Sequence, residues 1–324
     1  YAAEGYFTST EKRYYYYRAN PEGHNCYVIN PDATYGQDLY ADPDTFEAFV
    51  SKERGAYAIT SQKNSYAPYA SDAKRGIMLA DDRRSVIIRD EIRGMKKDEN
   101  TVMWFMQLPA VEAEIIDNKT VVLTKNGVKV NLQVLSDAKV QEITITEPVV
   151  METSVKMKTE LTNKDWKRLA IKLTTGKDLN ITVKMAQFCD PVGDTPIVDT
   201  PLADWSIPDG AIPSLPEIPT IPTLQDIKIG GQSAVKNFNG QTTYHMAILP
   251  YGTTAVPQVE AVTSFDATAN VTLPATLPGE AIIEVVNKTD ARLKNTYTLF
   301  MRAANNIEIE VSAEQEGNGS DKCM

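Results

Sequence analysis

The stretch "TVVLTKNGVKVNLQVL", residues 120–135, indicates the class of fold most directly. Two runs rich in β-branched residues flank Asn126-Gly127, and Asn-Gly is the strongest short signal for a tight β-hairpin turn. Turn residues recur on both sides of this hairpin about every 8–15 residues, which is typical of a β-sandwich. The sequence therefore predicts an all-β fold.

Other runs in the first 190 residues have the same strand-forming composition. The predicted strands besides the hairpin are 84–94, 100–109, 141–148, 169–175 and 180–188. Only residues 42–54, "DPDTFEAFVSKER", have helical character. We predict a large antiparallel β-sandwich over residues 1–190.

The chain changes character after residue 190. Residues 191–222 contain eight of the eighteen prolines, and proline neither donates a backbone hydrogen bond nor continues a helix. We predict a semi-rigid linker here, with Trp205 and its apolar neighbours packed against a domain. Residues 223–312 return to short strands with Gly-Gly and Asn-Gly turns, which predicts a smaller Ig-like β-sandwich. Residues 313–324 are a predicted disordered tail.

Composition excludes several classes of protein. The 324 residues carry a net charge of −10, whereas general nucleic-acid binding needs a basic surface. No apolar run is long enough for a membrane-spanning helix. Three widely spaced cysteines, Cys26, Cys189 and Cys323, do not make a disulfide framework. The chain begins at Tyr1 rather than at a methionine, so we expect it to be a piece of a longer protein.

One of the two histidines lies in an unusual stretch, "YYYYRANPEGHNCYVIN", residues 14–30. His24 is either a catalytic group or a polar residue at a turn between strands. Residues 14–18, four tyrosines and an arginine, are predicted to alternate on a strand, because aromatic residues favour strands. The other histidine, His245, is predicted to be structural. Arg83 and Arg84 are predicted surface charges.

Several short motifs follow one another in a characteristic order. They are GHN at 23–25, YVI at 27–29, GQ at 36–37, and the strand-like stretches 65–94 and 102–109. On these residues the first 190 positions resemble the heparinase II/III family of polysaccharide lyases. Residues 223–312 resemble the Ig-like modules appended to many exported carbohydrate-active enzymes.

The resemblance implies a fold and an activity. Members of that family join an N-terminal α/α toroid to a β-sandwich and cleave uronic-acid polymers by β-elimination in the cleft between them. This chain would be the C-terminal part, inactive by itself without the toroid. His24 would be the catalytic histidine, with Arg18, Asn25, Tyr15 and Tyr17 binding substrate.

The resemblance also bears on cofactors, partners and location. No cofactor is expected, but a structural metal is left open. Cys26 stands where some members have a histidine that helps to hold a metal. Met106 stands where members often have a histidine. An acidic stretch, Asp32, Asp38, Asp42 and Asp44, matches no known calcium loop. The implied partners are an acidic polysaccharide and the toroid, in a secreted or cell-surface bacterial protein. The alternative is a non-catalytic carbohydrate-binding or cell-surface structural protein.

Overall fold

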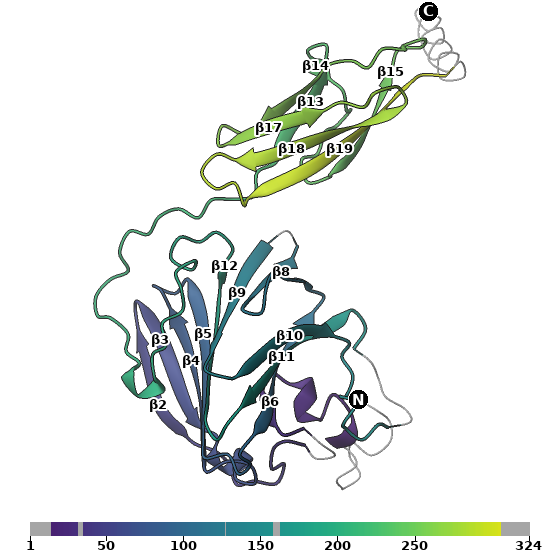
Figure 1. Cartoon of the computed structure of the whole chain (residues 1–324). Helices are drawn as coiled ribbons and strands as arrows, with labels where there is room; N and C mark the ends of the chain where they lie inside the picture. The colour runs from purple at the N-terminus through teal and green to yellow at the C-terminus, as the bar shows by residue number, and fades with distance from the viewer. Residues whose placement is uncertain (1–13, 32–34, 127, 158–162, 306–324) are drawn as a thin grey trace, which may run out of the picture. The chain divides into compact units, whose positions relative to one another are not determined.

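The computed structural model describes residues 14–31, 35–126, 128–157 and 163–305 (Figure 1). Almost all of its regular structure is β, which confirms the predicted fold class. The chain divides into two compact units, Tyr1–Pro216 and Glu217–Met324. Each unit is described by itself.

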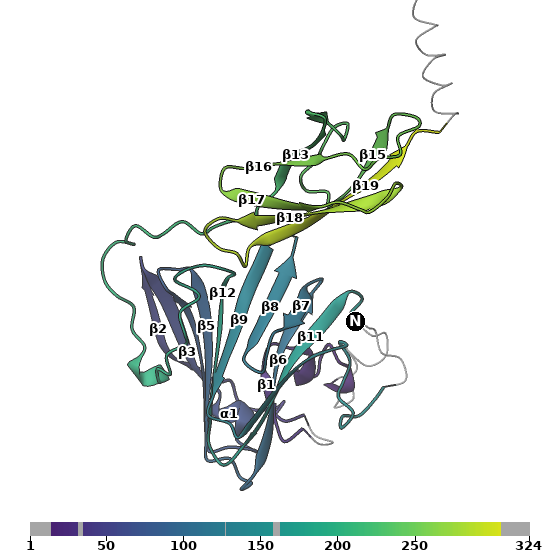
Figure 2. The ribbon, with the colours of Figure 1, turned by 45° about the horizontal axis from the view of Figure 1, so that its top comes forward.

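The first unit contains two antiparallel sheets (Figure 2). The larger sheet has, in spatial order, the strands β2 (Phe46–Lys52), β3 (Gly55–Ser61), β4 (Asp72–Ala80), β5 (Ser85–Arg93), β12 (Leu179–Gln187), β9 (Val128–Ser136), β8 (Thr120–Lys125) and β7 (Glu112–Ile115). The smaller sheet has β1 (Tyr27–Ile29), β6 (Asn100–Pro109), β11 (Trp166–Thr175) and β10 (Val140–Thr146). A single helical turn, α1 (Lys63–Tyr66), lies between β3 and β4.

The inner faces of the two sheets form one hydrophobic core. Alternate residues of β6 point inward, among them Val102 and Trp104, and they meet alternate residues of β5, β9 and β12. The predicted hairpin is confirmed, because Lys125 pairs with Val128 across the turn. Asn126 has a φ of 51°, in the left-handed region that asparagine tolerates better than most residues.

The helical character predicted for residues 42–54 is wrong. Residues 46–52 form the edge strand β2, which pairs with β3 and has a register shift near its start. Glutamate, alanine and lysine favour helices locally, but pairing with a neighbouring strand overrides so weak a preference. The edge position leaves Phe46 and Phe49 73% and 72% exposed.

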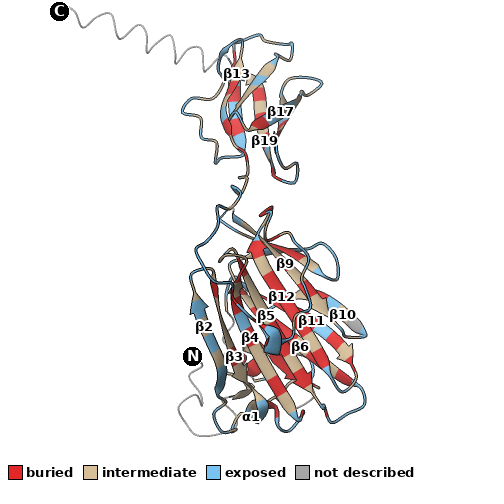
Figure 3. Cartoon of the chain, turned by 90° about the vertical axis from the view of Figure 1, so that its left-hand side faces the viewer, coloured by how far each residue is buried: buried red, intermediate tan, exposed pale blue. Residues whose placement is uncertain are grey.

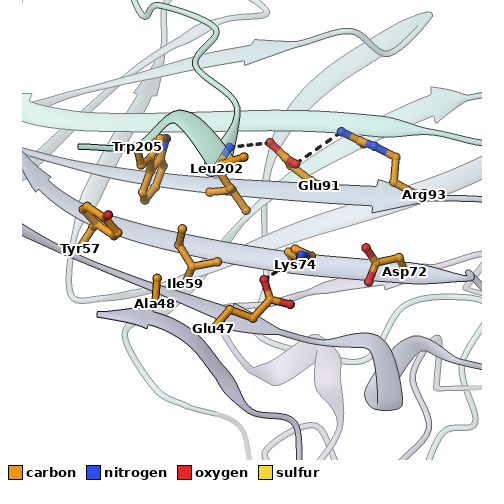
Figure 4. A pocket seen from close by; sticks show the side chains of 11 residues that line it. Glu47, Ala48, Tyr57, Ile59, Asp72, Lys74, Glu91, Arg93, Leu202 and Trp205 are labelled. Atoms are coloured by element: carbon orange, nitrogen blue, oxygen red, sulfur yellow. Dashed lines mark hydrogen bonds and ion pairs between the residues drawn. The ribbon is translucent and has the colours of Figure 1, made fainter. Parts of the chain in front are cut away.

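Part of the proline-rich segment belongs to the first unit. Residues 195–209, here called the strap, cross the outer face of the larger sheet, and Leu202, Trp205 and Ile207 are buried there (Figure 4). The predicted packing of Trp205 is thus confirmed. Beside the strap lies a hollow of about 410 Å³. Charged side chains in this hollow pair with one another, as Lys74 does with Glu47 at 2.7 Å.

The second unit also contains two sheets. One has the order β14 (Gln232–Ser233), β13 (Leu224–Ile229), β16 (Val259–Thr263), and the other β15 (Tyr244–Leu249), β19 (Lys294–Ala303), β18 (Gly279–Asn287), β17 (Ala267–Thr272). His245 is buried in this unit beside the ring of Phe238, which fits a structural role. The Ig-like topology stays a prediction, and the predicted tail 313–324 lies outside the described residues. In the described part of the chain, no helix is both long and apolar enough to cross a membrane.

Candidate functional site

A tight turn places His24 at the surface of the first unit. The 3₁₀ turn Pro21–Gly23 ends when the backbone N–H of His24 donates to the carbonyl oxygen of Pro21 at 3.1 Å. A Cβ atom at Gly23 would lie only 2.0 Å from the carbonyl oxygen of Tyr17. The glycine of the GHN motif is therefore required by packing.

The residue after His24 fastens the turn to both sheets. The side-chain oxygen of Asn25 accepts a hydrogen bond from the backbone N–H of Gln107 on β6, at 2.7 Å. Its carbonyl oxygen accepts one from Nη1 of Arg75 on β4, also at 2.7 Å. His24 itself is exposed, and within the described residues its imidazole makes no hydrogen bond or ion pair. The structure thus presents a solvent-accessible imidazole on an anchored loop.

The arginine that bonds the carbonyl oxygen of Asn25 belongs to a buried ion pair with Asp90. Nε and Nη2 of Arg75 donate to the two carboxylate oxygens of Asp90 at 2.6 and 2.8 Å, and Trp104 Nε1 donates to the same carboxylate at 2.9 Å. Asp90 is 1% exposed. Burial acts to lower the pKa of Arg75, but the neighbouring Asp90 carboxylate outweighs burial and raises it. The guanidinium therefore stays charged and holds the loop.

The GQ motif closes the same loop from its other end. Gly36 has a φ of +66°, and a Cβ there would lie 2.6 Å from Cβ of Val28. The amide nitrogen of Gln37 donates to the carbonyl oxygen of Tyr27 at 3.1 Å and to the hydroxyl of Tyr66 at 2.6 Å. The rings of Tyr27 and Tyr66 stack with centroids 4.3 Å apart. Tyr66 from the stretch 65–94 therefore packs and bonds with Tyr27 and Gln37 from the YVI and GQ motifs.

The Cys26 thiol is bonded within its own loop. It donates to the carbonyl oxygen of Pro21 at 3.0 Å, and burial raises its pKa to about 11. Metals bind the thiolate, so a metal at Cys26 would have to displace this proton. The described residues contain no cluster of three His, Cys, Asp or Glu side chains that could hold a metal ion.

The acidic stretch has a structural use where it is described. Asp44 accepts hydrogen bonds from the backbone N–H groups of Asn64 and Ser65 at 2.9 and 3.2 Å, at the start of α1. Asp38 accepts one from the backbone N–H of Tyr40. Asp32 lies outside the described residues. Asp38 and Asp44 thus bond to backbone groups.

The raised pKa of Cys26 gives a testable prediction. In the folded protein, alkylation of Cys26 by iodoacetamide is expected to reach half its maximal rate near pH 11, because only the thiolate reacts. In urea the same cysteine should reach half-maximum near its usual pKa of about 8.5. Mass spectrometry of the Cys26 peptide across a pH series measures both rates. A folded-state midpoint near pH 8.5 would show that the thiol is not shielded.

The strand predicted for residues 14–18 is not formed. Residues 14–20 are a 3₁₀ turn and bends that lead into Pro21. Tyr17 is fully buried, its hydroxyl donates to the side-chain oxygen of Gln107 at 2.6 Å, and the guanidinium of Arg168 lies 5.6 Å from its ring centroid. Tyr17 thus anchors the loop and does not face solvent as a substrate-binding residue would.

Tyr15 and Arg18 occupy different surroundings from Tyr17. Tyr15 is partly exposed and stacks on Tyr35 with centroids 5.5 Å apart, and Tyr14 meets the same ring edge-on. Tyr40, 67% exposed, joins this aromatic cluster through Tyr14. Arg18 is partly exposed in the turn. The candidates that remain at the surface are therefore His24, Asn25, Tyr15 and Arg18.

Sequence reasoning missed the buried anchors of the loop. Glu22 is 2% exposed, accepts a hydrogen bond from the backbone N–H of Met151 at 2.6 Å and pairs with Arg168 at 3.7 Å. A signal for such residues exists in the strands: Arg75 and Asp90 occupy inward positions in alternating runs, where an apolar residue is expected. A charged residue at an inward position implies a buried partner. Glu22 lies outside any strand and gives no such signal.

Beside the loop, part of the larger sheet's inner face is not covered by other described residues. The register places Phe49, Ala58, Ile77 and Ile88 in one row across β2 to β5, next to the row that contains Arg75. Ile77 is 50% exposed and Phe49 72%. Figure 3 shows the exposed residues of β2 at the edge of a sheet whose central strands are largely buried. This partly exposed apolar row is therefore next to Arg75, which bonds the carbonyl oxygen of Asn25.

Similarity to known proteins is found among solved structures. No family model and no curated protein matches the sequence. Among solved structures, the chain is similar to "Heparinase III-BT4657 gene product", with a TM-score of 0.41 and 13% identity over 93% of this chain and 33% of that one. It is also similar to a heparan sulfate lyase HepC mutant from Pedobacter heparinus, with a TM-score of 0.41 and 10% identity over 92% and 33% of the two chains. The chain thus spans about one third of the length of these proteins.

Proposed function

We propose that this chain is the C-terminal part of a polysaccharide lyase of the heparinase II/III kind, acting on a uronic-acid-containing polysaccharide outside a bacterial cell. The observation that carries the proposal is the exposed imidazole of His24, presented within a GHN motif on a loop fastened to both sheets. An anchored loop keeps a reacting group in place without reorganisation when substrate binds. A histidine that is only a polar turn residue does not need an exposed imidazole on an anchored loop.

The chemistry is a β-elimination. A base removes the proton from C5 of the uronate, the electron pair forms the C4–C5 double bond, and the bond from C4 to the glycosidic oxygen breaks. An acid then protonates the departing oxygen. The proton at C5 becomes acidic enough only when positive or hydrogen-bonding groups neutralise the adjacent carboxylate.

His24 is the proposed base, since imidazole has an unperturbed pKa near neutrality. Asn25 uses its side-chain oxygen to hold the loop, so its amide N–H groups are the part proposed to bind substrate. Tyr15 offers an aromatic surface and Arg18 a cation for a carboxylate or sulfate. Tyr17 is not carried into the proposal as a substrate-binding residue, because it is buried.

The rest of the site is proposed to come from an α/α toroid. The toroid would supply the acid and the groups that neutralise the carboxylate, and would cover the open sheet face that contains Phe49 and Ile77. An apolar face next to the catalytic loop suits a domain that must close over the same substrate. This chain alone is therefore expected to be inactive.

Replacing His24 with alanine tests the proposal. The full-length parent protein is mixed with a panel of uronic-acid polysaccharides, and the absorbance of the unsaturated product is followed. His24→Ala is expected to lower the rate at least about 100-fold, the usual contribution of a general base. His24→Gln, which keeps the size and polarity, should lose as much.

The controls separate chemistry from folding. Both variants should unfold at the same temperature as the parent, because the imidazole makes no bond within the described residues. Unchanged activity in folded His24→Ala would demote His24 to a turn residue. Absence of product from every polymer would favour the non-catalytic binding protein.

A further inference from the structure

A second hollow lies on the outer face of the smaller sheet, at the end of β1 that is remote from His24. Its volume is about 470 Å³, within the range of small-molecule sites. The residues around it are Asn30, Pro31, Lys97, Thr101, Met103, Met151, Thr153 and Lys172. These come from four separate segments, so the hollow exists only in the folded unit.

The charges around this hollow are of one sign. Lys97 and Lys172 contribute two positive charges, and none of the described residues around the hollow is acidic. Neither lysine makes an ion pair with another described residue. Glu142, the cross-strand neighbour of Lys172, is exposed but makes no ion pair with it. In a chain with a net charge of −10, this is a local concentration of positive charge.

The frame of the hollow is fixed by asparagine side chains. Asn30 donates to the side-chain oxygen of Asn100 at 2.9 Å and accepts from the backbone N–H of Thr101 at 3.0 Å. Asn100 in turn donates to the carbonyl oxygens of Lys97 and Gly176, at 2.9 and 2.8 Å. The backbone that bears Lys97 is thereby tied to β1. The two lysines are therefore presented from ordered backbone.

Apolar groups complete the hollow. Met103 points outward from the middle of β6, between Val28 of β1 and Lys172 of β11. Met103 and Met151 both pack against a small buried cluster of Val28, Phe105 and Ala170. Methionine adapts its shape to what it contacts, and its thioether and methyl groups suit the C–H face of a sugar ring. A cationic rim over an apolar floor matches an anionic sugar better than a bare inorganic ion.

We propose that this hollow is a subsite for an anionic sugar unit, with Lys97 and Lys172 binding its carboxylate or sulfate group. The inference deepens the proposed function and rests on it for the class of ligand. Asn30 is six residues from His24, at most about 20 Å along an extended chain.

Binding to this chain itself tests the subsite. Calorimetry is done with three probes: an unsulfated uronate tetrasaccharide, a sulfated uronate-containing tetrasaccharide and inorganic sulfate. Lys97→Ala and Lys172→Ala are each expected to weaken binding of at least one tetrasaccharide by about tenfold, the effect of losing a charge-assisted hydrogen bond. Added salt should weaken binding as well. The tetrasaccharide that binds tells carboxylate from sulfate recognition.

Matched variants make the outcome unambiguous. Lys177→Ala removes an exposed lysine that already pairs with Asp98, and should leave affinity unchanged. Binding is measured on this chain, which the proposed function expects to be inactive, so the subsite and the lyase activity fail independently. Wild-type chain that binds neither tetrasaccharide, or lysine variants that bind as tightly as wild type, would overturn the subsite. Inorganic sulfate that binds as tightly as the better tetrasaccharide would overturn it too.

Discussion

Replacing Asp90 with alanine is expected to lower the free energy of unfolding of the first unit by about 3–5 kcal/mol. The carboxylate is 1% exposed and accepts hydrogen bonds from Arg75 and from the indole of Trp104. Removing it leaves a largely buried guanidinium without its counter-charge and an indole N–H without a partner. Either loss is costly in an environment that water does not reach.

A more exposed ion pair, which involves the neighbour of Arg75 on β4, provides the control. Lys74 pairs with Glu47 at 2.7 Å, but both side chains are about one third exposed, at 33% and 36%. Glu47→Ala should therefore cost less than about 1 kcal/mol. The double variant Arg75→Met, Asp90→Leu should recover much of the loss, because an apolar pair can replace a buried ion pair. Denaturant unfolding measures all three, and equal costs for Asp90→Ala and Glu47→Ala would contradict the assignment.

The same substitution connects stability with the proposed site. Arg75 holds the carbonyl of Asn25, next to His24, only while Asp90 orients its guanidinium. In the full-length parent, Asp90→Ala should thus impair the reaction although Asp90 is not proposed to contact substrate. Arg75 and Asp90 are positioning residues in this sense.

The fold was predictable where the signal is local. Asn126-Gly127 defines a hairpin through its own turn preference, and the strand-forming composition of residues 100–109 and 169–175 marks β6 and β11. The edge strand β2 was not predictable, since its conformation depends on pairing with β3. The strand predicted for residues 14–18 was wrong for the same kind of reason: tyrosines favour strands, but a contact with Gln107, 90 residues away, holds Tyr17 in a turn.

The prediction that Arg84 is a surface charge is wrong for a similar reason. Its side chain is 11% exposed and pairs at 2.8 Å with Asp190, which is fully buried. Nothing near Arg84 in sequence reveals a partner 106 residues away. Arg83, by contrast, is exposed as predicted. The surface position of His24 was predictable from the turn that precedes it, whereas the buried charges that hold its loop depend on tertiary contacts.

Replacing Trp205 with alanine is expected to destabilise the first unit by about 3–5 kcal/mol, the usual cost of truncating a buried tryptophan. Trp205 is 8% exposed, meets the ring of Tyr57 edge-on with centroids 5.9 Å apart, and donates its indole N–H to the carbonyl oxygen of Thr200 at 3.2 Å. A Cβ at Gly76 would lie 2.6 Å from the indole, so the sheet has a gap that this ring fills. No other side chain of comparable size is present in the strap to replace it.

Trp166 supplies the matched control for this prediction. It begins β11 and is 36% exposed, so Trp166→Ala should cost less than about 1.5 kcal/mol. Denaturant unfolding of residues 1–216 measures both variants, and a second chain that ends at residue 190 lacks the strap altogether. That shorter chain should be destabilised at least as much as Trp205→Ala, because it also loses Leu202 and Ile207. If the chains 1–216 and 1–190 had the same free energy of unfolding, the strap would not stabilise the sheet. Residues 191–216 would then act only as a linker.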